Sequence, residues 1–290
     1  MSSYMGRKIN PQRFDRSQIR SYLILIPVSI IMVLPIIYVV VTAFKPLNEL
    51  FAYPPKFFVR NPSLQNFRDL WRVSQSMGIP FSRYLINSIV STALVVVLSI
   101  ALSLTTGYAL SKKDFRGRNV IATINTVSLM FVPTAVGIPR YLIISGVGLT
   151  NTFWVHIFPM LAMPVGLFLV KQFIDTVLDS LIELARIDGA GDFLIVHKII
   201  APIVKPALAT VGLLAFQSSW NAIEASTIYI TNDALKTLPF YLSVLTSQQN
   251  LVAGAGLSAA ATLIQLLPNM IIFIILQSRV MNTMAHSGIK

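Results

Sequence analysis

The sequence predicts an all-α, polytopic membrane protein with six transmembrane helices and with both termini in the cytoplasm. Hydrophobic residues make up 54% of the 290 residues and charged residues only 12%, whereas soluble domains contain roughly 25% charged residues. The apolar residues gather in runs long enough to cross a bilayer, which takes about 20 residues per helix. Disordered chains are poor in apolar residues, so disorder is excluded.

Charge and missing motifs exclude several functions. The net charge of +12 is spread between long apolar runs, which argues against a nucleic-acid-binding domain. Cysteine is absent, so there is no disulfide or thiolate nucleophile. The three histidines lack metal-ligand spacing, and no Gly-x-x-x-x-Gly-Lys-Ser/Thr loop is present to hold a nucleotide. We therefore expect no catalytic residue, metal or cofactor in this chain.

Six apolar segments are the expected spans, at roughly 21–44, 85–110, 119–147, 152–172, 203–229 and 254–280. The first is longer than the apolar part of a signal peptide, so we interpret it as an anchor rather than a cleaved leader. The third contains Pro133, Pro139 and Arg140. Because proline disrupts a helix interior, this span is expected to bend or break near Pro133.

The distribution of basic residues predicts the orientation. Of the 23 Lys and Arg residues, 15 lie in the N-terminus, the segments 112–118 and 171–205, and the C-terminus. Cytoplasmic segments carry the excess of positive charge, which places these four inside. Residues 1–20 then form a basic cytoplasmic N-terminus before a transmembrane domain, 21–290. Residues 45–84 form an ordered extracytoplasmic segment.

The segment at about 173–206 breaks the membrane pattern, because five of the 11 acidic residues fall within it and so many charges do not lie in lipid. We expect two short helices around a turn. Asp179 or Ser180 is predicted to cap the first helix, and Glu183 and Arg186 to pair at i,i+3 on its surface. Asp188-Gly189 ends the helix, because glycine adopts the required positive φ.

A second amphipathic helix is expected from about Gly191 to Ala201. Its predicted apolar anchors are Phe193, Leu194, Ile199 and Ile200. Pro202 and Pro206 then begin the fifth span, since proline is tolerated in a first helical turn. The physical pattern leaves two interpretations open: the loop docks onto a partner protein, or it lies on the membrane surface as an amphipathic helix.

The string Glu183-Leu-Ala-Arg-Ile-Asp-Gly-Ala190, followed by Ile199, Pro202 and Pro206, resembles the EAA loop of ABC-importer permeases. Leu184 and Leu178 depart from that family's pattern. Further stretches resemble the maltose-type, carbohydrate-uptake branch, and they occur in order along the chain: Asn66-Phe67, Asn87-Ser88, Gly107–Arg118, Gly148–Phe153, Trp220-Asn221, Gln277–Arg279 and Ser287–Lys290.

The resemblance implies a type I ABC-importer permease core in a bacterial plasma membrane. It implies a second, related permease subunit, two ATPase subunits that carry the ATP and Mg²⁺, and an extracytoplasmic substrate-binding protein that delivers an oligosaccharide. It also implies that the loop couples to the ATPases through Glu183, Ala185, Arg186, Asp188, Gly189 and Ala190.

Polar residues inside spans are candidates for the substrate path, because such groups face the interior of the bundle or a water-filled cavity. The main candidates are Gln217, Trp220, Asn221 and Glu224 in the fifth span, with Gln265 and Asn269 in the sixth. Trp220 is expected either to stack on a sugar or to pack structurally. Arg140 is expected at the outer mouth, and Gly254-Ala-Gly256 is expected to allow close helix packing.

Two functions from other classes remain as alternatives. A stand-alone secondary transporter of small solutes would show discontinuous paired spans and an intramembrane charged site, for which Glu224 is the plausible acid. An intramembrane enzyme would need a convergent nucleophile or metal set, and the sequence contains none.

Overall fold

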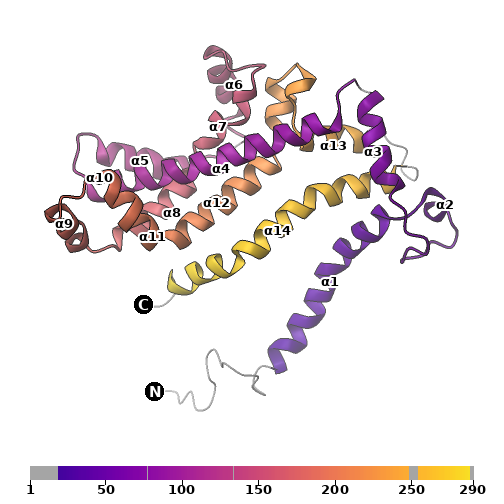
Figure 1. Cartoon of the computed structure of the whole chain (residues 1–290), viewed down its shortest axis with the longest axis horizontal. Coiled ribbons are helices and arrows are strands. Elements are labelled where there is room, and N and C mark those ends of the chain that lie inside the picture. Colours follow the sequence, from indigo (N-terminus) through magenta and orange to yellow (C-terminus); the bar gives the residue numbers. More distant parts are fainter. Residues whose placement is uncertain (1–18, 77, 133, 248–253, 288–290) are drawn as a thin grey trace. The chain divides into compact units, whose positions relative to one another are not determined.

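The computed structural model describes residues 19–76, 78–132, 134–247 and 254–287, which form helices and their connections (Figure 1). The expected basic N-terminus lies almost entirely outside the described residues, as do the last three residues of the C-terminus. The chain divides into a small unit, residues 1–70 and 249–263, and a large unit, residues 71–248 and 264–290. The small unit contains the first span, and the large unit contains the central spans and the charged loop.

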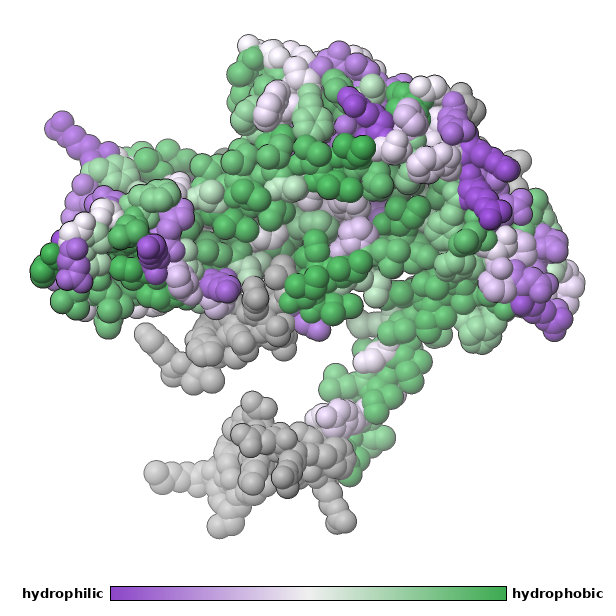
Figure 2. All heavy atoms as spheres, viewed as in Figure 1, coloured by the Kyte–Doolittle hydropathy of each residue, from purple (hydrophilic) through white to green (hydrophobic). Residues whose placement is uncertain are grey.

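In the small unit, α1 (Ile19–Ala43) matches the first predicted span. Most of its apolar side chains are exposed, and Figure 2 shows an apolar surface along it. A helix that is apolar and exposed is solvated by lipid rather than by water. α1 is followed by α2 (Leu47–Leu50) and by α3 (Gln65–Ser76), whose first half belongs to this unit.

The end of α1 is fixed by Asn66. Its Nδ2 donates to the carbonyl oxygens of Ala43 at 2.9 Å and of Lys45 at 2.8 Å. These carbonyls have no partner within the helix, so the amide replaces the missing donors. Gly256, near the start of α14 (Ala255–Ser287), allows this arrangement, because a Cβ at that position would lie 2.6 Å from Oδ1 of Asn66. The expectation of close packing at the Gly254-Ala-Gly256 sequence is confirmed at Gly256.

Two more asparagines perform the same task in the large unit. Nδ2 of Asn87 donates to the carbonyls of Ala234 and Lys236, both at 2.9 Å. Oδ1 of Asn151 accepts from the backbone of Thr231 at 3.2 Å and of Asn232 at 2.9 Å. Each amide satisfies backbone groups that a membrane protein has to pair internally.

The long helix α4 (Phe81–Lys112) is central to the large unit and matches the second span. It packs against α8 (Pro164–Asp175) and α12 (Lys205–Trp220). A Cβ on Gly107 would lie 3.2 Å from Val170, and one on Gly212 would lie 3.1 Å from Ile100. Small residues at these contacts let the helices approach closely.

The third predicted span is interrupted, as expected. α5 (Arg118–Ser128) ends before the Pro133 region, and α6 (Gly137–Gly146) begins after it. Within the described chain, three helices are individually long and apolar enough to span a membrane, namely α1, α4 and the part of α14 at Ala255–Ile275. Up to five spans result if two bent helix pairs are counted as one span each.

The remaining elements are short. The fourth predicted span contains a 3₁₀ turn (Phe153–His156), α7 (Phe158–Leu161) and α8, with a bend of 42° between α7 and α8. After α12 follow a π-helical turn (Ala225–Tyr229), a 3₁₀ turn (Asp233–Leu235) and α13 (Leu238–Ser247). The fifth span is therefore helical to Trp220 and irregular beyond it.

We predict that Gly256→Ala lowers the stability of the purified protein by about 1–3 kcal/mol, because the new methyl group displaces the Asn66 amide from two carbonyls. Thermal unfolding in detergent, followed by size-exclusion chromatography, measures this. Gly146→Ala in α6 is the matched control, since a Cβ there meets nothing within 4 Å. Equal unfolding temperatures for the two variants would contradict the proposed fit.

Candidate functional site

The first helix of the charged loop is α9 (Asp179–Ile187). The predicted cap is wrong: Leu178 occupies the N-cap position without a side-chain hydrogen bond, and Asp179 is the first helical residue. Asp179 instead binds Nζ of Lys112 at 2.7 Å. Its carboxylate still lies in the first turn, where the helix dipole favours negative charge.

The predicted end of α9 at Asp188-Gly189 is confirmed. Gly189 has a φ of +83°. The N–H of Ala190 donates to the carbonyl of Ala185 at 2.9 Å, and the N–H of Gly189 donates to that of Arg186 at 3.0 Å. This pair of bonds is a Schellman motif, which closes a helix with a left-handed residue, usually glycine. The resemblance-derived residues Ala185 to Ala190 thus form one compact turn.

α9 has apolar residues on two faces. Ile182 and Ala185 belong to a buried cluster that includes Val170 and Ile174 of α8. Leu184 is 59% exposed and Ile187 is 82% exposed. Exposed apolar side chains beside charged ones are the composition of a protein-binding surface.

The expected pair between Glu183 and Arg186 is not formed. Nη2 of Arg186 instead lies 3.7 Å from Oδ1 of Asp192, the first residue of α10 (Asp192–Leu194). Asp192 also binds Nζ of Lys113 at 2.7 Å. The hydrogen bond from Lys113 holds the pKa of Asp192 below its usual range, so this carboxylate is charged at neutral pH.

The second loop helix continues from α10 through a π-helical turn (Ile195–Ile200) into α11 (Ala201–Ile203). The prediction that Phe193 and Leu194 anchor it is wrong, because they are 76% and 42% exposed. Ile195 and Val196 are buried instead, together with the correctly predicted Ile200. Ile195 and Ile200, the two ends of the π-turn, are therefore buried on the same side of this helix.

The chain then turns sharply into the fifth span. The axis from Asp192 to Ile203 and the axis of α12 differ by 86°. Pro202 and Pro206 each lie in the first turn of a helix, α11 and α12, which fits their missing N–H groups. The charged loop is therefore joined to α12 through a single sharp bend.

At the other end of α12, the side chain of Asn221 forms a polar group with Gln265 and Asn269 of α14. Oδ1 of Asn221 accepts from Nε2 of Gln265 and from Nδ2 of Asn269, both at 3.3 Å. Nδ2 of Asn221 donates to the carbonyl of Gln217 at 2.8 Å. Oδ1 of Asn269 is buried without a hydrogen-bond partner among the described residues. The side chains of Gln217 and Asn221 are exposed.

Trp220 does not offer its ring to a ligand in this structure. It is 4% exposed, stacks on Phe216 at a centroid distance of 5.8 Å, and donates from Nε1 to the carbonyl of Gln265 at 3.0 Å. The expectation of a ring open to stacking on a sugar is thus wrong for this conformation. The structural alternative holds: Trp220 joins α12 to α14 beside Asn221.

Arg140 and Glu224 form an ion pair that the sequence did not predict. Nη1 of Arg140 lies 3.2 Å from Oε1 of Glu224, and both side chains are partly exposed. Tyr229 lies beside them, with its hydroxyl 3.5 Å from Glu224 and its ring stacked on Tyr141. The available sequence signal was two opposite charges in the third and fifth expected spans, which contain few others.

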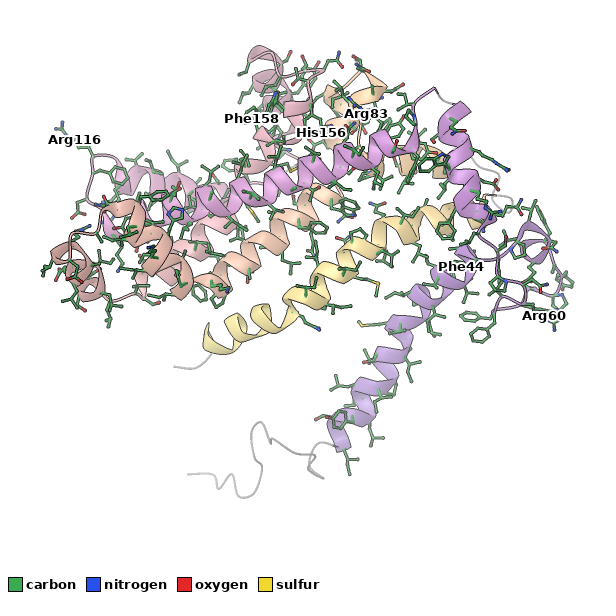
Figure 3. All side chains as sticks on the ribbon, in the orientation of Figure 1. Phe44, Arg60, Arg83, Arg116, His156 and Phe158 are labelled. Atoms are coloured by element: carbon green, nitrogen blue, oxygen red, sulfur yellow. The ribbon has the colours of Figure 1, made fainter. Side chains whose placement is uncertain are left out.

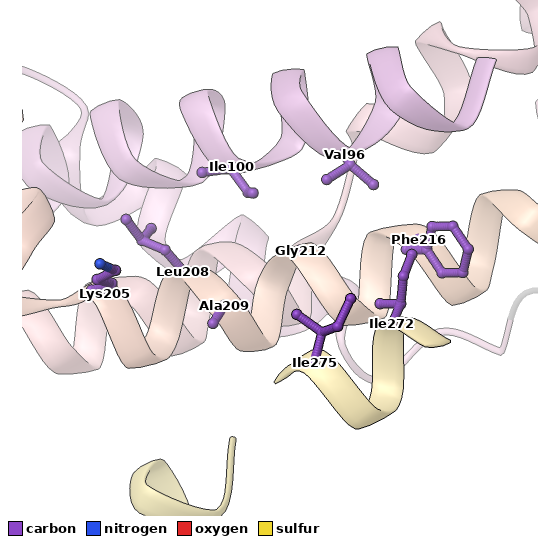
Figure 4. A pocket seen from close by; sticks show the side chains of 9 residues that line it. All are labelled: Val96, Ile100, Lys205, Leu208, Ala209, Gly212, Phe216, Ile272 and Ile275. Carbon is purple, nitrogen blue, oxygen red and sulfur yellow. The ribbon is translucent and has the colours of Figure 1, made fainter. Parts of the chain in front are cut away.

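A groove of about 340 Å³ lies between α4, α12 and α14 (Figure 4). Its lining is apolar except for one lysine and comprises Val96, Ile100, Lys205, Leu208, Ala209, Gly212, Phe216, Ile272 and Ile275. None of the four candidate path residues contributes to it. Its character fits contact with hydrocarbon rather than with a polar solute.

The fold and the charged loop together define a membrane transport subunit, namely a bundle of apolar helices with a charged helical loop at 173–206. A family model described as "Binding-protein-dependent transport system inner membrane component" matches residues 99–280. The chain belongs to this family. It is a permease subunit of an ABC importer, a multi-pass protein of the bacterial plasma membrane, and ATP hydrolysis is performed by partner subunits.

Two relatives illustrate the family. The chain is 29% identical to the probable ABC transporter permease protein YurM of Bacillus subtilis, over 88% of this chain and 83% of that one. It is 26% identical to the arabinooligosaccharides transport system permease protein AraQ of the same organism, over 97% and 98% of the two chains.

A solved structure shares the fold. It is a crystal structure of a bacterial ABC transporter involved in the import of the acidic polysaccharide alginate. The match has a TM-score of 0.77 at 23% identity and covers 92% of this chain and 99% of that chain.

We expect Trp220→Phe to destabilise the protein by about 1 kcal/mol, because it removes one buried hydrogen bond while keeping an aromatic ring. The unfolding temperature of the detergent-purified complex is the readout. Trp154→Phe is the control, since that ring is 51% exposed and should change stability little. If Trp220→Phe were as stable as the control, the proposed joint between α12 and α14 would be wrong.

Proposed function

We propose that this chain forms, with a second related permease, the alternating-access path of an oligosaccharide importer. In this proposal the chain has six spans and both termini lie in the cytoplasm. Residues 1–20 are the cytoplasmic N-terminus, residues 45–84 are the extracytoplasmic segment, and residues 173–206 are the coupling loop. The native chain has no cysteine. Single cysteines at Arg60 and Arg116 should therefore react from opposite sides of sealed vesicles, and reaction from the same side would refute this topology.

The coupling role is supported by two features of α9: the helix is closed by a tight turn, and several of its side chains are exposed. Leu184 and Ile187 supply apolar contact area, and the exposed Glu183 and Arg186 supply polar contacts to an ATPase subunit. Ala185, Asp188, Gly189 and Ala190 hold the turn rigid. Because the loop continues into α12, ATP-driven closure of the ATPases tilts the core helices and opens the path alternately to the two sides.

The partners follow from this role. Two ATPase subunits would supply ATP and Mg²⁺, and a substrate-binding protein would deliver the sugar from outside. Membership in a permease family of binding-protein-dependent systems supports this assembly and disfavours a stand-alone secondary transporter. Co-purification of the chain with an ATPase and a second permease tests the assembly, and transport by the chain alone would refute it.

The polar group around Asn221 is the proposed substrate contact. Gln217, Asn221 and Glu224 expose groups that bind sugar hydroxyls, while Trp220 positions Asn221 through α14. Relatives named for arabinooligosaccharide and galactooligosaccharide transport support a sugar substrate. Uptake assays with neutral and uronate-containing oligosaccharides should find a transported sugar whose KM rises in Asn221→Ala; an unchanged KM would remove Asn221 from the path.

Gly189→Val should abolish most transport and most substrate-stimulated ATP hydrolysis while leaving membrane insertion intact. A β-branched residue at a φ of +83° costs roughly 1–3 kcal/mol, so the turn opens. The measurements are sugar uptake and ATPase activity in proteoliposomes that contain the complete complex.

Gly191→Val provides the matched control for this prediction. Gly191 lies two residues away in the same loop, its φ is −73°, and a Cβ there meets nothing within 4 Å. It should therefore retain coupled transport. Normal transport by Gly189→Val, or an equal loss in both variants, would count against the role of the turn.

A further inference from the structure

Two consecutive lysines at the end of α4 contact both helices of the charged loop. Nζ of Lys112 lies 2.7 Å from Oδ1 of Asp179, the first residue of α9. Nζ of Lys113 lies 2.7 Å from Oδ2 of Asp192, the first residue of α10. Each loop helix is therefore tied at its first residue to the same end of α4.

Lys112 is the more buried of the two. Its side chain is 8% exposed, and Nζ also donates to the carbonyl of Val177 at 2.6 Å. Val177 follows the end of α8 and is itself buried. A buried ammonium is stable only with such partners, so Lys112 fixes the ends of α4 and α8 and the start of α9 to one another.

Lys113 is more exposed, but a second group of α4 supports it. The hydroxyl of Tyr108, which is 4% exposed, donates to Oδ1 of Asp192 at 3.3 Å. Arg186 of α9 lies 3.7 Å from the same oxygen. Asp192 is thus held from α4 by two groups and from α9 by a third, which makes a network rather than an isolated surface pair.

The close packing of α4 against its neighbours favours the transmission of a displacement. The close approaches at Gly107 and at Gly212 leave no room for α4 to slide against α8 or α12 without rearranging side chains. Close-packed interiors transmit strain rather than absorb it. A force on the end of α4 therefore reaches the whole central bundle of the large unit.

We propose that Lys112 and Lys113 form a clamp through which the coupling loop drives α4 together with α12, so that loop and bundle move as one body. This inference rests on the proposed coupling function. In the absence of the clamp, the loop would act on the bundle mainly through the chain connection at 202–206, where the axes differ by 86°. The lysines are positioning residues, since they act through Asp179 and Asp192.

The test uses the complete complex in proteoliposomes and compares Lys113→Glu, Asp192→Lys and the charge-swapped double variant. Each single variant places like charges together and should reduce sugar transported per ATP hydrolysed by about fivefold, the upper range for a partly exposed pair. The double variant restores the attraction between positions 113 and 192 but leaves a lysine beside Arg186, so it should recover part of the wild-type ratio and exceed both single variants. ATPase subunits should co-purify with all three.

Arg116→Glu is the matched control, because it makes the same charge change in the same connection. Arg116 projects away from the helices (Figure 3) and forms no ion pair within the described part of the chain. It should retain the wild-type transport ratio. Normal ratios in the single variants, or a double variant as poor as they are, would overturn the clamp. Loss of the ATPases from a single variant would also overturn it, since the defect would then be docking.

A distance measurement separates the clamp from a general loss of stability. Spin labels at Leu102 of α4 and Phe193 of α10, both exposed, report the separation of helix and loop. In wild type this separation should stay constant between nucleotide-free and ATP-bound complexes, and it should change in Lys113→Glu. A changing distance in wild type would contradict the clamp while leaving docking of α9 unaffected.

Discussion

A bilayer interior accepts neither unpaired backbone groups nor unpaired charges, and this constraint shapes the protein at every level. It keeps apolar residues on the surface of α1, and it confines most charges to connections. Where the helices end or break, side-chain amides replace the missing backbone partners, as Asn66 does at the end of α1 and Asn87 does at the turn Asp233–Leu235. The same constraint makes a loop with five acidic residues informative, because such a segment has to find its partners outside the lipid.

The sequence predicted elements whose signals are local. Apolar run length located α1, α4 and α14, the proline-rich stretch predicted the interruption between α5 and α6, and Asp188-Gly189 predicted the end of α9. It failed where the answer depends on register or on distant residues. The buried anchors of the second loop helix are Ile195 and Val196 rather than Phe193 and Leu194, and no local pattern pairs Arg140 with Glu224.

In the candidate site, too, the local signals predicted correctly and the long-range contacts were missed. Resemblance located the string from Glu183 to Ala190, and the structure gives it a physical form as a helix closed by a Schellman motif. For Trp220 the sequence left two roles open, and its burial favours the structural one, a hydrogen bond that joins α12 to α14. Asn66, Asn87 and Asn151 occur in short family-like stretches, and the side-chain amide of each binds two backbone groups of another segment. Their sequence signals are weak because the groups they bind lie far away in sequence, as with Asn87 and Lys236.

Site-directed cross-linking is the most direct test of the proposed contact between α9 and an ATPase subunit. Single cysteines replacing Glu183 or Arg186, in a chain that otherwise has none, would be joined to the ATPases by a short bifunctional reagent in membranes that transport sugar. We predict a cross-linked product with an ATPase subunit at both positions. Labelling of both positions by lipid-borne reagents, without an ATPase product and with uptake intact, would contradict it.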